Sequence, residues 1–382
     1  MNEVRNLMPD KNKRNILPSA VFFILSFVPV FLFSGNVVSK EISPVYALIW
    51  SLFAGFTGWA AFFTGRVAGY RRGFFVTMAT GFLVHFKFGL ISKIFESSCF
   101  KGTPYCHIAI ATSFFNYLYQ QYLALMSGNW KLWAPVSIAF LWIFATLAAG
   151  RAFCSWSCFY GGIDDFFSGI LKKPVLKLDK IAFAARDFPM ALLIFFLLVS
   201  FSSMLPSYCL WLCPFKFTGE LMDIDPGIKN IQMILMIAAI IFLVMLSFLL
   251  KKRAFCSILC PFGAWQAFFG KINPFRIGFD KEKCTECGIC FQSCPVYAMD
   301  FKKGEKLKIL DYCNLCGECV SACPENALNY SVFRIKTKDV ESGFGKLLNP
   351  ESFFILSILI FSGTLGSLFV PAAIHDVMHW LM

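Results

Sequence analysis

Long apolar runs separated by short charged stretches dominate the hydrophobic pattern of this 382-residue chain. A helix that crosses a bilayer needs about 20 consecutive and mainly apolar residues. The pattern predicts such helices near Leu17–Val38, Val45–Thr64, Leu132–Ala149, Pro189–Leu205, Ile231–Leu250 and Phe353–Ala373. Gly73–Ile91 is a weaker seventh candidate, because His85 and Lys87 lie inside it. We therefore expect a polytopic α-helical membrane protein with about six to seven spans.

Two apolar segments need a separate interpretation. The first run follows the basic stretch Lys11–Arg14, as in a signal peptide, but it contains two prolines and no clear cleavage site. We interpret it as a retained membrane anchor. The segment Tyr105–Met126 is long enough to cross, but it carries Asn116, Gln120 and Gln121. We expect it to lie on, or to dip into, the outer face of the membrane.

The distribution of basic residues predicts the orientation of the spans. One set of flanks contains Arg66, Arg71, Arg72, Arg151, Lys172, Lys173, Lys251, Lys252 and Arg253. The opposite set, which is expected to face outward, begins with Lys40 and Glu41. Cytoplasmic loops carry an excess of Lys and Arg, so the first set is expected inside, together with residues 281–346. The formal net charge of +12 then arises on the membrane flanks. Nucleic-acid binding is not needed to explain it.

Two adjacent cysteine runs have the spacing C-x2-C-x2-C-x3-C-P, which binds cubane iron–sulfur clusters. In such pairs the fourth cysteine of each run ligates the other cluster. The sequence therefore predicts one cluster on Cys284, Cys287, Cys290 and Cys323, and a second on Cys313, Cys316, Cys319 and Cys294. Zinc sites or disulfides would need other spacings or an oxidising compartment. We expect a small α+β ferredoxin domain with two [4Fe–4S] clusters.

A second set of cysteines lies in an internal repeat. Gly150–Gly169 and Lys252–Lys271 are identical at nine of twenty positions, and each contains the sequence Arg-Ala-Phe-Cys-Ser-x2-Cys. Each copy follows directly on a predicted span, so the pattern indicates a duplicated span-plus-motif unit, a symmetry common in membrane carriers. A third pair, Cys209 and Cys213, lacks the Arg-Ala-Phe lead.

The C-x3-C spacing of the repeat allows several kinds of chemistry. On a helix, residues i and i+4 share one face, so Cys154 with Cys158 and Cys256 with Cys260 could face one partner. Four thiolates brought together would suit a further iron–sulfur cluster, a copper or zinc site, or a dithiol pair that cycles redox state. The alternative is that these are buried packing residues.

The predicted outer side carries its own cysteines and histidines. Cys99 and Cys106 would lie in an oxidising compartment, where a disulfide is the simplest outcome. His375 and His379 share a helix face and suit either metal or haem ligation or an interfacial position. His85 suits either a contact to quinone or a position at the membrane boundary.

The spans, the repeated Arg-x-Phe-Cys-x3-Cys motif and the pair of cubane runs resemble the membrane polyferredoxins. That group contains NapH, the C-terminal half of NosR and the CcoG/RdxA/FixG proteins. Within the group, the arrangement of motifs in this chain most resembles that of NapH. The resemblance covers roughly residues 130–330. It implies that the eight ferredoxin cysteines are cluster ligands, and that the chain is a membrane component of a quinol dehydrogenase. The first copy departs from the family pattern, with Cys158-Phe159 in place of Cys-Pro, and residues 331–382 add a further span.

These observations predict four regions. They are N-terminal transmembrane helices with an outer-face loop (1–130), the duplicated span and C-x3-C core (131–275), the cytoplasmic ferredoxin domain (276–335), and a linker, helix and outer tail (336–382). We expect a multi-pass protein of a bacterial inner membrane that relays electrons between quinol or a cytoplasmic carrier and a redox partner subunit. No catalytic residue is predicted, and an enzymatic role stays open. The alternatives are a copper reductase or cofactor assembly factor, as in CcoG, and a structural scaffold of a membrane redox complex.

Overall fold

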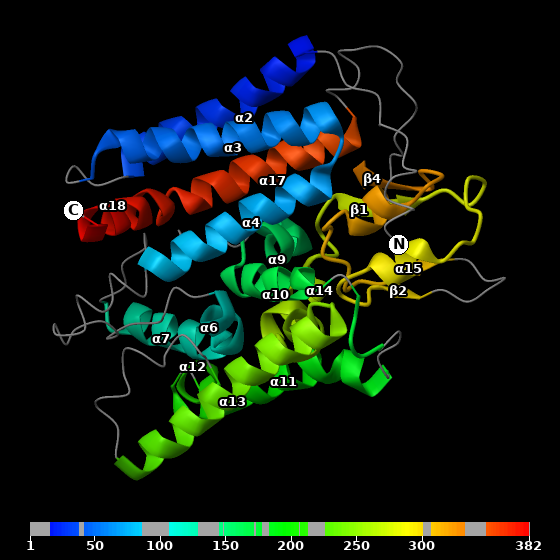
Figure 1. Cartoon of the computed structure of the whole chain (residues 1–382). Helices are drawn as coiled ribbons and strands as arrows, with labels where there is room; N and C mark the ends of the chain where they lie inside the picture. Colours follow the sequence, from blue (N-terminus) through cyan, green and yellow to red (C-terminus); the bar gives the residue numbers. More distant parts are fainter. Residues whose placement is uncertain are drawn as a thin grey trace.

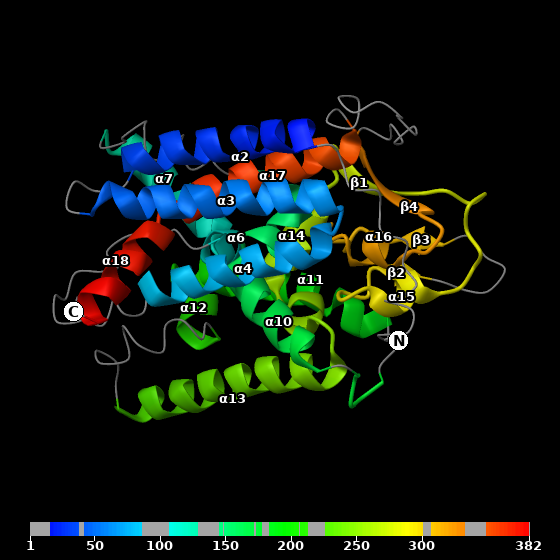
Figure 2. The same ribbon diagram turned by 45° about the horizontal axis from the view of Figure 1, so that its top comes forward.

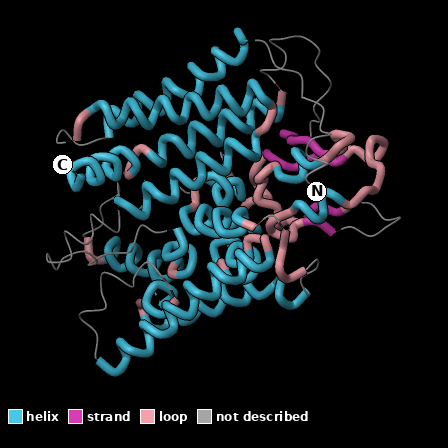
Figure 3. The backbone as a smooth tube through the Cα atoms, viewed as in Figure 1, coloured by secondary structure: helices cyan, strands magenta, loops and turns pink. Residues whose placement is uncertain are grey.

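The chain folds mainly into helices, with two small two-stranded sheets gathered at one end (Figure 3). The structure is a computed structural model, and it describes residues 16–37, 42–85, 107–128, 145–147, 149–171, 173–177, 183–205, 207–212, 226–300, 307–332 and 349–381.

Four helices that lie side by side form one layer (Figure 1). They are α2 (Ile16–Val37), α3 (Pro44–Thr64), α4 (Val67–Leu83) and α17 (Pro350–Gly366). The last helix, α18 (Val370–Leu381), continues from α17 and packs on α3 and α4. In Figure 1, α17 lies between α3 and α4, so a C-terminal helix packs among the N-terminal helices of this layer.

Local sequence signals fix the ends of α3 and its contact with α17. Ser43 caps the start by accepting a hydrogen bond from the Val45 amide, and Gly65 ends the helix in the left-handed region with φ 67°. The indole nitrogen of Trp50 donates to the carbonyl of Gly363 at 2.9 Å. A Cβ atom at Gly366 would lie 2.4 Å from the Trp50 ring, so only glycine permits this close approach of the two helices.

A second group of helices lies on the other side of α4. It comprises α6 (His107–Thr112), α7 (Phe114–Met126), η2 (Gly150–Ala152), α9 (Phe153–Trp156), α10 (Phe159–Ile170), α11 (Phe183–Ser203), α12 (Ser207–Trp211), α13 (Pro226–Leu250), η4 (Phe255–Leu259) and α14 (Pro261–Phe269). Helix α10 packs against α4 on one side and against α13 on the other. The repeated cysteine motifs lie in the short elements η2 to α10 and η4 to α14, at the centre of this group.

The two cysteine runs form a small α+β unit, as the sequence predicts. Strand β1 (Phe275–Phe279) pairs antiparallel with β4 (Leu328–Val332), and β2 (Met299–Asp300) pairs with β3 (Lys308–Ile309). Helices α15 (Ile289–Ser293) and α16 (Glu318–Ala322) pack against each other. In the register of the first pair, Phe275 lies opposite Val332 and Phe279 opposite Leu328. We refer to residues 275–332 as the ferredoxin unit.

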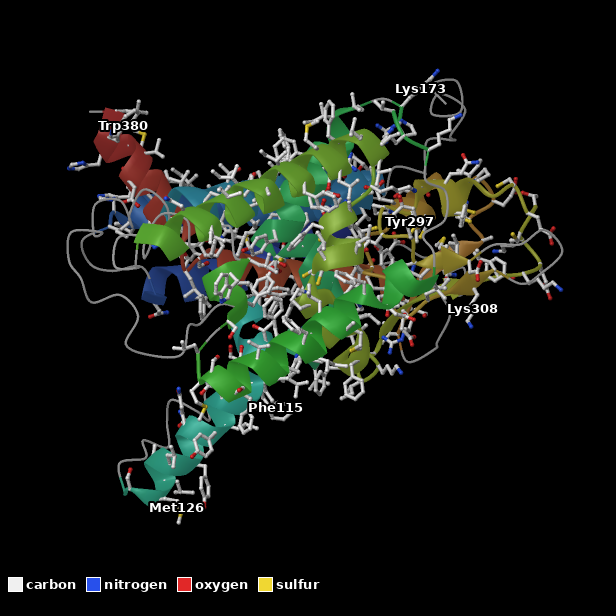
Figure 4. All side chains as sticks on the ribbon, turned by 90° about the horizontal axis from the view of Figure 1, so that it is seen from below. Phe115, Met126, Lys173, Tyr297, Lys308 and Trp380 are labelled. Atoms are coloured by element: carbon white, nitrogen blue, oxygen red, sulfur yellow. The ribbon has the colours of Figure 1, made fainter. Side chains whose placement is uncertain are left out.

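The ferredoxin unit lies at one end of the helices (Figure 2). Helix α4 contacts α16 near its beginning, and α17 contacts β4. Lys252, two residues after the end of α13, donates a hydrogen bond to the carbonyl of Gln292. In Figure 4, Lys308 lies at this end and Trp380 at the opposite one. The basic flanks around Arg71 and Lys252 are therefore on the same side as the ferredoxin unit.

Two of the predicted spans meet the length and composition that a bilayer requires. Within the described residues, these are Leu17–Asn36 and Pro44–Thr64. The predicted spans at Pro189–Leu205 and Ile231–Leu250 fall on α11 and α13, whose described apolar stretches are shorter. Gly73–Ile91 falls partly on α4, and most of Leu132–Ala149 lies outside the described residues. A total of six to seven spans stays a prediction.

The predicted C-terminal span Phe353–Ala373 is bent. Helices α17 and α18 meet at an angle of 45°, so together they would make a broken third span. Pro371 has no amide hydrogen to give to the carbonyl of Ser367, and its ring would collide with that carbonyl in a continuous helix. The segment Tyr105–Met126 is likewise divided, into α6 and α7, which meet at Ser113.

Candidate metal centres

Cysteines from both runs of the ferredoxin unit line one cavity. Its wall contains Cys284, Cys287 and Cys290 from the first run and Cys323 from the second. The structure therefore brings together the four residues that the spacing assigns to one site. Cys287 is exposed and the other three are half-buried, so this cavity, called the outer cavity below, opens toward solvent.

The remaining four ferredoxin cysteines line a second cavity. Cys313, Cys316 and Cys319 of the second run meet Cys294 of the first run there. Cys294, Cys316 and Cys319 are buried. This cavity, called the inner cavity, is lined entirely by residues of the ferredoxin unit.

The backbone of the two runs curves in the same way. Both take a left-handed conformation at equivalent places: at Glu286 and Leu315, at Gly288 and Gly317, and at Tyr297 and Asn326. These turns direct amide groups at sulfur, so that Ala298 N donates to Cys294 Sγ and Ala327 N to Cys323 Sγ, each at 3.3 Å. Left-handed backbone is costly for residues other than glycine, and such strain is typical of sites that hold a ligand.

The four cysteines of the internal repeat also meet. Cys154 and Cys158 of the first copy and Cys256 and Cys260 of the second line a third cavity, called the repeat cavity. Two segments about a hundred residues apart in sequence thus contribute one pair of thiols each. Packing cysteines need no such convergence.

The second cysteine of each pair lies at the start of a helix. Cys158 precedes α10 and Cys260 precedes α14, both with extended backbone. Amides of the first helical turn donate to each sulfur, from Tyr160 and Gly161 in one copy and from Phe262 and Gly263 in the other. A helix N-terminus stabilises a thiolate through its free amides and its dipole. The two cysteines of each pair therefore do not share one continuous helix, because the helix breaks before the second cysteine.

The repeated glycine follows from this geometry. A Cβ atom at Gly161 would lie 2.3 Å from the carbonyl oxygen of Cys154, and one at Gly263 would lie 3.3 Å from that of Cys256. Each glycine lets the new helix begin close to the preceding cysteine.

The repeat cavity and the inner cavity share a wall. Val296 and Asn314, which follow Cys294 and Cys313 closely in sequence, line both of them. In Figure 4, Tyr297, which lines the repeat cavity, lies where the ferredoxin unit meets the helices. Metal groups in the two cavities would be separated by little more than these side chains.

The repeat motifs are bonded directly to the ferredoxin unit. The Ser155 hydroxyl donates to the carbonyl of Asn314 at 2.7 Å, and the Arg253 amide donates to the carbonyl of Pro295 at 2.8 Å. Lys252 Nζ donates to the carbonyl of Cys294 at 2.7 Å. Both copies of the motif thus fix the position of the inner cavity.

Burial makes these cysteines weak acids in the absence of a metal. Desolvation raises the pKa of the Cys154 thiol to about 11 and that of Cys260 to about 12. Desolvation also raises the pKa values of Cys158 and Cys256 well above the usual thiol value; neighbouring thiolates in the same cavity add to the effect, and Asp164 adds to it for Cys256. Positive iron would replace the protons, since metal ligands must be deprotonated.

A buried ionic network that the sequence analysis missed lies beside the inner cavity. Asp165 accepts from Arg253 Nε at 2.7 Å and from Arg71 Nη2 at 3.4 Å, and all three side chains are buried. Arg71 also donates to Glu318 Oε1 at 3.1 Å, and Glu318 lies between Cys316 and Cys319. Burial alone would raise the pKa of Asp165, but Arg253, Arg71 and Arg72 hold it well below its usual range. The sequence feature that could have revealed this network is the occurrence of the charged residues Asp165 and Arg71 next to apolar segments.

Arg151 lines the repeat cavity. Its guanidinium donates to the carbonyl of Gly263 at 3.2 Å and to the carbonyl of Asp311, and it lies 5.2 Å from the centre of the Tyr312 ring. Burial lowers the pKa of Arg151, while negative charge on Cys154 and Cys313 opposes that shift. This arginine therefore interacts with cysteines of both neighbouring cavities.

The described residues contain no group of three or more His, Cys, Asp or Glu side chains that could hold a metal ion. This is true of the eight ferredoxin cysteines as well as of the four repeat cysteines. A zinc or copper ion needs its ligand sulfurs at about 2.3 Å from one centre. Among the described residues, the cysteines of the three cavities do not meet this arrangement.

The other candidate residues are only partly placed. Cys99, Cys106 and Cys213 lie outside the described residues, and Cys209 lies on α12, away from the strands (Figure 1). His85 Nδ1 lies 3.5 Å from Asp376, which also approaches His375 at 3.6 Å. The rings of His375 and His379 are 6.2 Å apart. Ligation by these histidines stays a prediction.

Comparison with known families gives two kinds of match. A family described as a 4Fe-4S dicluster domain matches residues 276–324. A second, described as a 4Fe-4S binding domain, matches three segments, 132–177, 188–224 and 232–280. Each of these three segments contains one C-x3-C pair. None of the curated proteins and none of the solved structures compared with the chain is a match.

These matches identify an iron–sulfur, ferredoxin-like protein with an electron-transfer role. Iron–sulfur clusters are its cofactors, and two apolar helices are consistent with association with a membrane.

Proposed function

We propose that the chain is a membrane electron relay whose outer, inner and repeat cavities each hold one [4Fe–4S] cluster through four cysteines. The observation that carries this proposal is the convergence of the two C-x3-C pairs on one cavity that adjoins the inner cavity. A cluster, when bound, supplies a one-electron carrier. The protein supplies the thiolates, the amide donors and the separation from solvent.

The donor set of the repeat cavity fits this cofactor. It presents four cysteines, two of which accept amides from the start of a helix, and the surrounding wall is largely apolar and aromatic. The position of these four cysteines directly beside the ferredoxin unit supports a cluster rather than the single copper ion that a metal reductase would handle. The family match over both copies supports the same assignment.

The three cavities differ in their exposure to solvent and in the elements that line them. The outer cavity is open at Cys287, the inner cavity is buried, and the repeat cavity lies among α10, η4 and α14. In this proposal a soluble carrier exchanges electrons at the Cys287 side, and a membrane partner or quinol exchanges them through the repeat cavity. The resemblance to NapH favours quinol as the membrane substrate.

The basic flanks support a cytoplasmic position for the ferredoxin unit. Arg66, Arg71 and Lys252 are at the helix ends nearest to it, where the positive-inside rule expects the cytoplasm. The proposed location is an inner membrane, with the chain crossing it several times.

Low-temperature electron paramagnetic resonance on the reduced full chain tests the relay. Clusters in adjoining cavities should give spin-coupled signals after reduction with dithionite. The double variant Cys154→Ser/Cys260→Ser should lose one component and keep the two that belong to the ferredoxin unit. Ser257→Ala is the matched control, because Ser257 lines the same cavity without offering a thiol.

A scaffold would behave differently in this experiment. Clusters that stay silent under every reductant would contradict the relay and favour a structural role. Reduction of the clusters by a short-chain quinol under anaerobic conditions would identify quinol as the membrane substrate. If dithionite reduces the clusters but the quinol does not, the soluble carrier is the electron donor.

A further inference from the structure

The two arginines of the repeated motif occupy equivalent sequence positions but different electrostatic surroundings. Arg253 is fully buried, and its Nε and Nη2 both donate to Asp165. The carboxylate neutralises much of its charge. The second copy has Ala267 where the first copy has Asp165, so this acid occurs only once in the repeat.

Arg151 has no such carboxylate. It is 8% exposed, and its two hydrogen bonds go to the backbone carbonyls of Gly263 and Asp311. Within the part of the chain that the structure describes, no Asp or Glu forms an ion pair with it. The two carbonyl dipoles accept from Nη1 and Nη2, while the buried Nε has no hydrogen-bond partner among the described residues, and the charge of the guanidinium stays in place.

The positive charge of Arg151 lies close to the cysteines of two cavities. Arg151 lines the repeat cavity together with Cys154 and Cys260. The carbonyl of Asp311 that it binds is two residues before Cys313, and the Tyr312 ring on which it lies is directly before that cysteine. One uncompensated cation thus lies between the repeat cavity and the inner cavity.

We propose that Arg151 raises the reduction potential of the clusters in the inner and repeat cavities, and thereby permits electrons to move into them from the outer cavity. Reduction adds one negative charge to a cluster, and burial disfavours that added charge. A nearby buried guanidinium favours it, because Coulomb interactions are strong where water is excluded. The proposal rests on the proposed function, since it requires clusters in these cavities.

A redox titration of the purified full chain, followed by electron paramagnetic resonance, tests the role of Arg151. In Arg151→Gln the signals of the inner-cavity and repeat-cavity clusters should titrate at a more negative potential. The expected change is at least about tenfold in the reduced-to-oxidised ratio at a given potential, which is ~59 mV for a one-electron couple. The signal of the outer cavity serves as an internal reference and should not move. Arg151→Lys keeps the positive charge, so its clusters should have reduction potentials close to those of the wild-type chain.

Arg276→Gln is the matched control, because Arg276 is an exposed arginine that also donates to backbone carbonyls, those of Phe275 and Lys271. It should leave all potentials unchanged. Unshifted potentials in Arg151→Gln, with iron content intact, would overturn the tuning role alone. Loss of iron in both Arg151 variants would overturn it in favour of a purely structural role. Absence of cluster signals from the wild-type chain would overturn the proposed function itself.

Discussion

Single buried charges determine how the helices meet the ferredoxin unit. Asp165 connects Arg71 of the first helical layer with Arg253 of the second repeat copy, and Arg71 reaches on to Glu318 beside Cys319. A buried ion pair adds little net stability, but removal of one partner leaves an uncompensated charge. The network therefore acts mainly by permitting one arrangement of these three elements.

At this scale we predict that Asp165→Ala lowers the free energy of unfolding by about 3–5 kcal/mol, because it leaves Arg253 and Arg71 buried without their shared acceptor. Thermal unfolding of the full chain in detergent measures it. The exposed substitution Glu282→Gln is the control and should change stability by less than about 0.5 kcal/mol. An equally small effect of Asp165→Ala would show that the network does not hold the elements together.

The depressed pKa of Asp165 adds a pH dependence with a defined sign. Its contribution to stability is complete above the ordinary aspartate value of about 3.9 and is lost as pH falls through the lower value of the folded state. The wild-type chain should therefore lose stability relative to Asp165→Ala only below about pH 4. A difference that disappears already near neutral pH would contradict the ionic network.

Short helices, rather than long ones, create the repeat cavity. In each copy one helical turn carries the first cysteine, the chain extends at the second, and a new helix begins whose amides point back at its sulfur. Gly161 and Gly263 permit the close return of the chain in the two copies. The duplicated element supplies two equivalent halves of one site.

Gly161→Ala should disturb this element, because the added Cβ would lie 2.3 Å from the carbonyl oxygen of Cys154. We expect a loss of about 1–3 kcal/mol in stability and weaker retention of iron by the repeat cavity. Gly73→Ala on α4 is the matched control, since no heavy atom lies within 4 Å of its Cβ position. Equal behaviour of the two variants would contradict the close approach.

The sequence predicts sites whose ligands are set by local spacing better than those that depend on tertiary packing. The crossing of Cys294 and Cys323 between the two runs follows from their spacing, and the structure brings the corresponding groups together. The break between Cys154 and Cys158 was not predicted, since i and i+4 positions suit a helix equally well. The partnership of Arg71 with Asp165 depends on packing between segments ninety-four residues apart, which no local pattern encodes.

At the scale of the whole molecule, the charge asymmetry of the helix ends predicts the side of the ferredoxin unit. An impermeant amine-reactive reagent should label Lys173 and Lys308, both exposed in the structure (Figure 4), in inside-out vesicles and not in right-side-out ones. Lys40, on a flank predicted to face outward, should show the opposite pattern. Labelling of Lys308 from the outside would contradict a cytoplasmic ferredoxin unit.

The central claim is that the chain holds three clusters, one of them between the two copies of its internal repeat. The iron and acid-labile sulfide content of the purified full chain tests it most directly. We predict about twelve iron and about twelve sulfide per chain, falling to about eight of each in Cys154→Ser/Cys260→Ser. About eight of each in the wild-type chain would contradict the claim, because only the outer and inner cavities would then be filled.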